Sequence, residues 1–253
     1  METSLYPRIS KLLSERGLCS RREADRYIKQ GCVLVDGEVV STLGTRAHPD
    51  SRIELKKEAI DRQSKKRTVI LHKPLGIVSN LPEGAYEEAA SLITKEHADL
   101  SHPKTKKTFQ ANENHDSLLS KRLSVAGRLD IDSTGLLVLT EDGRIVSQLI
   151  KPDGEIEKEY CVKVRGQLTE QVLDKLRFGL ELDGKKLKPA QVDIDSYGRL
   201  VLVLKEGKKR QIRRMCELVG LEIIALKRTR VGQVELGLLP YGKWRFLDEN
   251  ESF

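Results

Sequence analysis

Two carboxylates and an arginine stand just before one of the most apolar runs in the chain. Residues 127–140 read GRLDIDSTGLLVLT, so Arg128, Asp130 and Asp132 precede a segment that predicts a buried strand. An acid at the entrance to such a strand, with an arginine fixed nearby, can stay ionised while it is partly removed from water. A carboxylate of this kind can serve as a nucleophile or as a base. Aspartates also cap turns, and the spacing alone suits that role equally well.

A guanidinium suited to pair with this acid lies in the segment 206–220, EGKKRQIRRMCELVG. Apolar residues at helical spacing predict a helix over residues 208–219, and they are Ile212, Met215, Cys216 and Val219. Arg213 lies at the edge of this stripe, where a guanidinium needs a carboxylate partner. The most conspicuous candidate for that partner is Asp130.

The same segment begins with three cations, Lys208, Lys209 and Arg210. In the predicted helix they occupy the first turn, where the helix dipole disfavours positive charge by roughly 0.3–1 kcal/mol each. A helix amino terminus that carries cations is suited to bind an anion. We therefore expect this end of the helix to bind phosphate.

A third basic cluster lies near the amino terminus. The pattern of Ser20 followed by Glu23 is a capping box, which predicts that a helix begins there. Arg22, Arg26 and Lys29 recur on one stripe of this helix, opposite its apolar residues. Three cations on one stripe repel one another, which favours a phosphate backbone over plain solvent as their partner.

The elements that would position these groups fall into two parts. Residues 6–55 predict two helices, a hairpin that turns at Asp36 and Gly37, and a short strand. The charged segment 56–67 lacks an apolar period and is typical of a linker. From there on strands and helices mix without a repeated βα unit, which favours an α+β fold. Residues 83–121 show little apolar period, and we expect an extended surface loop.

Composition narrows the class of partner. The chain has 253 residues, a net charge of +7 and a pI near 9.1, which favours a polyanionic partner. Its four cysteines form no C-x-x-C pair and its histidines show no ligand spacing, so we expect neither a disulfide framework nor a metal site. No apolar run approaches membrane-spanning length, and we expect a cytoplasmic protein without membrane contact.

Residues 8–40, RISKLLSERGLCSRREADRYIKQGCVLVDGEVV, resemble an S4 domain, a small RNA-binding module found in ribosomal proteins and RNA-modifying enzymes. The segment GRLDIDSTGLLVLTEDG at 127–143 resembles the central motif of the pseudouridine synthases that act on ribosomal RNA. Three further stretches agree with it, HKPLGIVS at 72–79, EKEYCV at 157–162 and EGKKRQIRRMCELVG at 206–220.

This resemblance implies an α+β chain with an S4-like RNA-binding domain over 1–58, a linker over 59–67 and a catalytic domain with a mixed, largely antiparallel sheet over 68–253. It implies a monomer that needs no cofactor, because isomerising a uridine requires only breaking its N-glycosidic bond and forming a carbon–carbon bond to the same sugar. The base must leave the stack to be reached.

The resemblance also assigns roles to residues. Asp130 resembles the essential aspartate of the family, and Arg213 the basic residue that pairs with it. Tyr160 resembles the tyrosine that stacks on the target base, although the same residue would suit the core of a strand. Arg128 resembles the arginine that fills the gap left by the flipped nucleotide, and Lys73 a residue that positions the site.

The implied substrate is 23S rRNA, with a uridine of a tRNA anticodon loop as a second candidate. The alternatives are a 16S rRNA enzyme and a non-catalytic RNA-binding or ribosome-assembly protein, and the latter would be expected to lack the acid of GRLD. Residues 87–122 make a longer segment than relatives have before this motif. Its cations are candidates for RNA contacts, and they are Lys104, Lys106, Lys107, Lys121 and Arg122.

Overall fold

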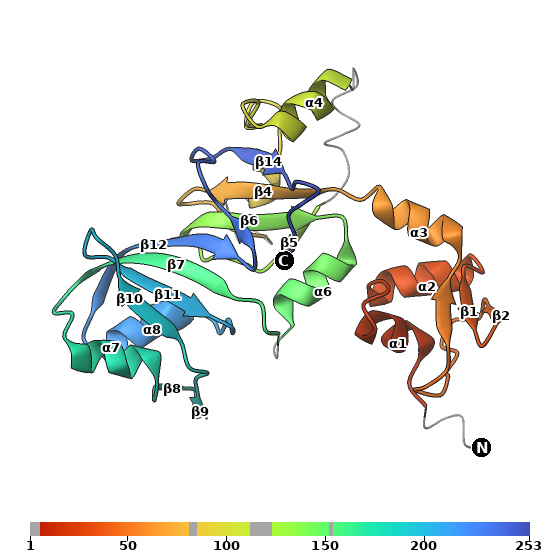
Figure 1. The fold of residues 1–253 in the computed structure, drawn as a ribbon, viewed down its shortest axis with the longest axis horizontal. Helices are drawn as coiled ribbons and strands as arrows, with labels where there is room; N and C mark the ends of the chain where they lie inside the picture. The colour runs from red at the N-terminus through yellow and green to blue at the C-terminus, as the bar shows by residue number, and fades with distance from the viewer. Residues whose placement is uncertain (1–5, 81–84, 112–122, 152–153) are drawn as a thin grey trace.

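A computed structural model describes residues 6–80, 85–111, 123–151 and 154–253. Its first part contains helices α1 (Ile9–Glu15) and α2 (Arg21–Lys29) and a three-stranded sheet (Figure 1). The strands of this sheet are β1 (Val33–Val35), β2 (Glu38–Val40) and β3 (Ile53–Leu55). The predicted order of helix, helix, hairpin and short strand is confirmed.

Local sequence signals explain this part. The Ser20 hydroxyl accepts a hydrogen bond from the Glu23 amide, and the Glu23 carboxylate accepts one from the Ser20 amide, which completes the predicted capping box. Asp36 and Gly37 both have positive φ angles, as a two-residue type I′ hairpin turn requires.

The second part is built on a nine-stranded sheet in the order β10-β11-β7-β12-β6-β4-β14, with β5 beside β6 and β13 beside β12. Its strands are β4 (Thr68–Lys73), β5 (Ser124–Ala126), β6 (Thr134–Thr140), β7 (Lys158–Arg165), β10 (Gln191–Ile194), β11 (Leu200–Leu204), β12 (Glu222–Val231), β13 (Val234–Glu235) and β14 (Trp244–Phe246). Among the described strands only β6 and β12 pair in parallel, so the predicted largely antiparallel sheet is confirmed.

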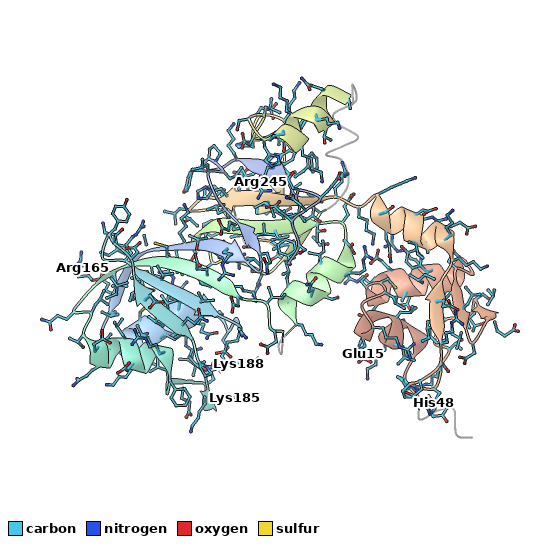
Figure 2. The ribbon with its side chains drawn as sticks, viewed as in Figure 1. Glu15, His48, Arg165, Lys185, Lys188 and Arg245 are labelled. Carbon is cyan, nitrogen blue, oxygen red and sulfur yellow. The ribbon has the colours of Figure 1, made fainter. Side chains whose placement is uncertain are left out.

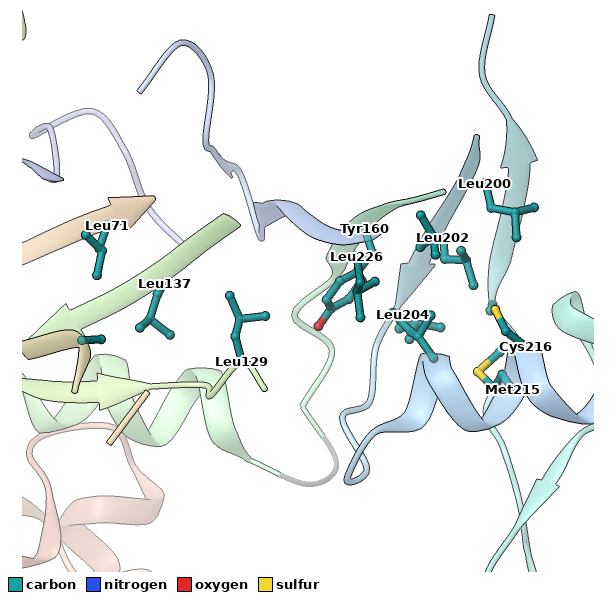
Figure 3. Packing of buried hydrophobic residues seen from close by; sticks show 14 of the residues in the cluster. Leu71, Leu129, Leu137, Tyr160, Leu200, Leu202, Leu204, Met215, Cys216 and Leu226 are labelled. Atoms are coloured by element: carbon teal, nitrogen blue, oxygen red, sulfur yellow. The ribbon is translucent and has the colours of Figure 1, made fainter. Parts of the chain in front are cut away.

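Both faces of this sheet are covered. Leu137 and Leu139 of β6 belong to the core that includes α7 (Glu170–Arg177) and α8 (Gln211–Leu218), while Leu136 and Val138 belong to the core that includes α6 (Gly143–Ile150). Figure 3 shows part of the first core, where residues of β11 face the side chains of α8. A small hairpin of β8 (Glu181–Leu182) and β9 (Lys185–Lys186) lies beyond α7.

The expected surface loop over 83–121 is wrong for part of its length. A 3-10 helix η2 (Ala89–Leu92) and helix α4 (Pro103–Ala111) form there. The Phe109 ring packs 6.0 Å from that of Trp244, and the Phe246 amide donates a hydrogen bond to the Thr105 hydroxyl. These contacts join residues far apart in the chain, so the local pattern did not reveal them. Lys121 and Arg122 lie outside the described residues.

Two boundaries also differ from expectation. The predicted linker 59–67 begins inside helix α3 (Lys57–Ser64), whose Ala59 packs into the core of the first part. Helix α8 begins at Gln211, because Arg210 has a φ of 52° and cannot continue a right-handed helix backwards. The cations Lys208, Lys209 and Arg210 therefore precede the helix instead of forming its first turn. In the part of the chain that the structure describes, no helix has both the length and the apolar character needed to cross a bilayer.

Candidate active site

The loop from Gly127 to Ser133, between β5 and β6, is held rigidly by the segment that follows β4. The buried Ser79 hydroxyl donates to the Leu129 carbonyl at 2.6 Å and accepts from the Leu129 amide at 2.8 Å. The Gly76 amide donates to the Ile131 carbonyl at 3.0 Å. The motif HKPLGIVS thus holds the backbone of Leu129 and Ile131, the two neighbours of Asp130, by hydrogen bonds.

A buried arginine holds the other end of the loop. Strand β6 pairs with β12 at Thr134 and Gly135 but with β5 from Val138 onward, so its Leu136 carbonyl lies where the partner changes. The Arg228 side chain of β12 fills this place. It donates to the Leu136 carbonyl at 2.8 Å and to the Gly127 carbonyl at 2.9 Å.

Asp130 faces open space. Its side chain is 35% exposed, and its contact with Arg210 is long, at 3.9 Å. Within the described residues its carboxylate accepts no hydrogen bond, so it caps no turn there. A carboxylate with few structural contacts, on a loop held by hydrogen bonds, is available to a ligand.

Asp132 is the partner of the arginines instead. Arg213 donates to the Asp132 carbonyl at 2.7 Å and lies 3.2 Å from its carboxylate, while Arg210 pairs with the same carboxylate at 3.0 Å. Burial would raise the pKa of Asp132, but the two guanidiniums outweigh it and hold that pKa below its ordinary value. The expected pairing of Arg213 with Asp130 is therefore wrong, because the turn after Asp130 presents Asp132 toward α8.

Lys73 is fully buried at the end of β4. Its ammonium donates to the Pro74 and Ile77 carbonyls, each at 2.7 Å. Burial lowers its pKa to about 8 against the opposing pull of Asp132 and Asp130. Lys73 thus lies near the two aspartates, and its burial suits the positioning role that the resemblance gives it better than a direct contact with RNA.

The loop opens onto a cleft of about 640 Å³. The predicted site residues that line it are Arg128, Asp130, Tyr160, Lys208, Lys209, Arg210 and Arg213. Figure 3 shows Tyr160 between Leu129 on one side and Leu204 and Leu226 on the other. Tyr160 is 9% exposed and belongs both to the core and to the cleft wall, so its place in the core does not remove it from the cleft.

The remaining predicted residues lie elsewhere. Arg22, Arg26 and Lys29 are exposed on α2, and in the described chain none of them forms an ion pair. The amino end of α6 lies against this helix: Lys66 contacts the carboxylates of Glu23 on α2 and Asp142 before α6. The other end of α6 lines the cleft with Leu149 and Ile150, so one short helix links the two regions.

The sequence alone did not reveal three residues of the site, Ser79, Lys158 and Arg228. Lys158 had a usable signal, because strand alternation places it on the same side of β7 as Tyr160. Ser79 lies inside the motif HKPLGIVS, but its partner is 50 residues away. Arg228 had no local signal, since its role depends on where β5 replaces β12 beside β6.

The comparisons agree with this arrangement. Residues 67–218 match the family described as RNA pseudouridylate synthase, and residues 7–53 match the S4 domain. The chain is 35% identical over 246 residues to the dual-specificity RNA pseudouridine synthase RluF of Escherichia coli (strain K12), covering 96% of this chain and 76% of the relative. It is 32% identical to the ribosomal large subunit pseudouridine synthase B of Bacillus subtilis (strain 168), covering 96% and 93%.

A solved structure shares the fold along nearly the whole chain. The crystal structure of a pseudouridylate synthase aligns with a TM-score of 0.62 and 25% identity, covering 96% of each chain. The similarity to S4-bearing pseudouridine synthases expected from the motifs is thus confirmed by sequence and by fold. The chain belongs to the RNA pseudouridylate synthase family and carries an S4 domain ahead of its synthase domain.

Proposed function

We propose that this enzyme converts a uridine of 23S rRNA to pseudouridine, with Asp130 as its essential carboxylate. The observation that carries the proposal is the contrast between the two acids of the loop. Asp132 is occupied by Arg210 and Arg213, whereas Asp130 faces the cleft with only a distant cation. Of the two, Asp130 is the acid that lines the cleft and has no close cationic partner.

The reaction needs what this cleft offers. The bond from the ribose to N1 of uracil breaks and a bond from the ribose to C5 forms. The hydrogen of C5 leaves as a proton and N1 takes one up, so the composition of the nucleotide does not change. The detached base must be held and turned, and the flat ring of Tyr160 in the cleft wall suits that task. A uridine within a stack must first be flipped out, and the exposed Arg128 beside Asp130 is placed to fill the gap.

The charge of the cleft supports RNA as the substrate. Nine of the described residues that line it are lysine or arginine, and two are acids. Lys208, Lys209 and Arg210 form one rim, and Arg22, Arg26 and Lys29 add a second basic surface on the S4 domain. The large-subunit target follows the relative from Bacillus subtilis, whose name states it. A tRNA uridine is the second candidate, because another relative is named as dual-specific.

The test is tritium release from RNA labelled at C5 of uridine, since bond formation at C5 expels that hydrogen. Unmodified 23S and 16S rRNA and tRNA are incubated with wild type, Asp130→Asn and a control, Asp193→Asn, which changes an exposed acid of β10 away from the cleft. We expect wild type and the control to release tritium from 23S rRNA at equal rates. Asp130→Asn should release at least 1,000-fold less, on the order of the losses seen when an essential catalytic group is removed.

Two outcomes would contradict the proposal. Undiminished release by Asp130→Asn would remove the role of that residue. Release from 16S rRNA alone, or from none of the RNAs despite tight binding, would remove the proposed target.

A further inference from the structure

One wall of the cleft contains two cations that no acid neutralises. Lys158 of β7 and Arg228 of β12 both line the cleft. Neither forms an ion pair within the described parts of the chain. Buried or half-buried charges in proteins are ordinarily paired, so an unpaired couple beside a reacting group calls for an explanation.

Arg228 is fixed in place before any ligand arrives. Its residue is 2% exposed, and two of its nitrogens are held by the Leu136 and Gly127 carbonyls. Both acceptors are neutral, so its full positive charge remains uncompensated. Its third nitrogen, Nη1, has no acceptor in the part of the chain that is described, and it is free to donate to a ligand.

Lys158 adds a second charge on the same side of the sheet. Arg228 lies directly opposite Tyr160 in the pairing of β12 with β7, and Lys158 lies two residues before Tyr160. The Lys158 ammonium has one weak hydrogen bond, to the Ile156 carbonyl at 3.3 Å. Burial lowers the pKa of Lys158, and repulsion between its charge and that of Arg228 lowers it further. An anion bound between them would remove that repulsion.

We propose that Lys158 and Arg228 form a phosphate-binding site in the cleft wall, which takes a backbone phosphate of the RNA next to the nucleotide that is modified. This inference rests on the proposed function, because Tyr160 marks where the base lies. Lys158 and Tyr160 are about 7 Å apart along the strand. A nucleotide spans a similar length from its base to its phosphate, so one nucleotide can contact both residues.

The experiment compares Lys158→Met with Lys163→Met, which removes the same type of charge from an exposed position on the opposite side of β7, near the Arg165 end labelled in Figure 2. Binding of a 23S rRNA transcript is measured over a series of salt concentrations, and tritium release is measured in parallel. We expect Lys158→Met to weaken binding and to reduce the slope of log K against log salt by about 1, the effect of one lost phosphate contact. Its kcat/KM should fall 10- to 100-fold. Lys163→Met should match wild type in both measurements.

Folding is controlled separately. Methionine keeps the length of the side chain and removes a half-buried charge, so the thermal midpoint of Lys158→Met should not be lower than that of wild type. Lys158→Arg, which keeps the charge, should retain most of the salt slope. If Lys158→Met and Lys163→Met give the same slope while wild type turns over, the phosphate site is wrong and the proposed function stands. If wild type releases no tritium, the proposed function fails, and the difference in slope still tests the phosphate site.

Discussion

At the scale of single residues, the loop separates two acids that look alike in the sequence. Asp130 and Asp132 both follow Arg128 at short spacing. The backbone turns after Asp130, so Asp132 pairs with Arg210 and Arg213 while Asp130 lines the cleft. A guanidinium that holds both the Asp132 backbone and its carboxylate fixes the loop more firmly than a side-chain pair alone. We therefore infer that Arg213 influences Asp130 through the position of the loop.

Lys73 gives a prediction at this scale. Its folded-state pKa of about 8 lies below the ordinary value of 10.5, so the unfolded chain binds the proton more tightly between these two values. The burial cost of this charge is present at neutral pH and disappears as pH rises above 8. The unfolding free energy of wild type, measured relative to that of Lys73→Met, should therefore increase by roughly 2 kcal/mol between pH 7 and pH 10, at about 1.4 kcal/mol per pKa unit.

Urea denaturation of both proteins across that range provides the measurement. The difference between the two curves is the relevant quantity, because other groups that titrate there in the unfolded chain affect both proteins alike. One such group is the Cys19 thiol, whose pKa burial raises from 9.0 to about 12 in the folded protein. A constant difference from pH 7 to pH 10 would mean that Lys73 keeps an ordinary pKa.

At the scale of elements, the parallel contact of β6 with β12 depends on a residue without a side chain. Gly135 has a φ of +107°, and a Cβ there would lie 2.2 Å from the Arg228 carbonyl oxygen. Gly135→Ala should cost at least about 3 kcal/mol of unfolding free energy, because backbone must move and the new residue is strained. Gly198→Ala is the matched control. It also has a positive φ, of +72°, but nothing lies within 4 Å, so we expect a cost of about 1–2 kcal/mol.

Chemical denaturation of the two variants tests this. Equal losses would show that strain alone matters and that β6 and β12 tolerate a wider spacing. A larger loss for Gly135→Ala, accompanied by lower turnover, would tie the strand contact to the loop that Arg228 holds.

Individual elements also show which structural features the sequence alone predicts. The capping box at Ser20 and the turn at Asp36 are interactions within four residues, and both predictions are confirmed. The partner of Arg213 was predicted wrongly, and so was the loop where helix α4 forms. Each depends on contacts between segments far apart in the chain. Local pattern identifies an element and its exposed face, but only tertiary packing decides which of two neighbouring acids a given arginine contacts.

At the scale of the whole molecule, the S4 domain is docked on the synthase domain through a small, tightly packed contact. A Cβ on Gly143 of α6 would lie 2.4 Å from the Ser20 Cβ and 2.9 Å from the Glu23 carboxylate. The Lys66 ammonium contacts the carboxylates of Glu23 and Asp142 across the same contact. Because the opposite end of α6 lines the cleft, this docking sets where the basic face of α2 lies relative to Asp130.

Gly143→Ala should therefore release the S4 domain without unfolding either part. Gly143 does not have a positive φ, so alanine adds no backbone strain, and only the atoms of α2 must give way. We expect trypsin to cleave the basic segment 56–67 at least fivefold faster and the affinity for 23S rRNA to fall 3- to 10-fold, because two basic surfaces held at a fixed distance bind one RNA more tightly than two that move independently. Ser147→Ala, in the middle of the same helix, should match wild type in both. If cleavage is faster but affinity is unchanged, the S4 domain finds its RNA independently of the cleft, and the rigid spacing between the two surfaces has no part in recognition.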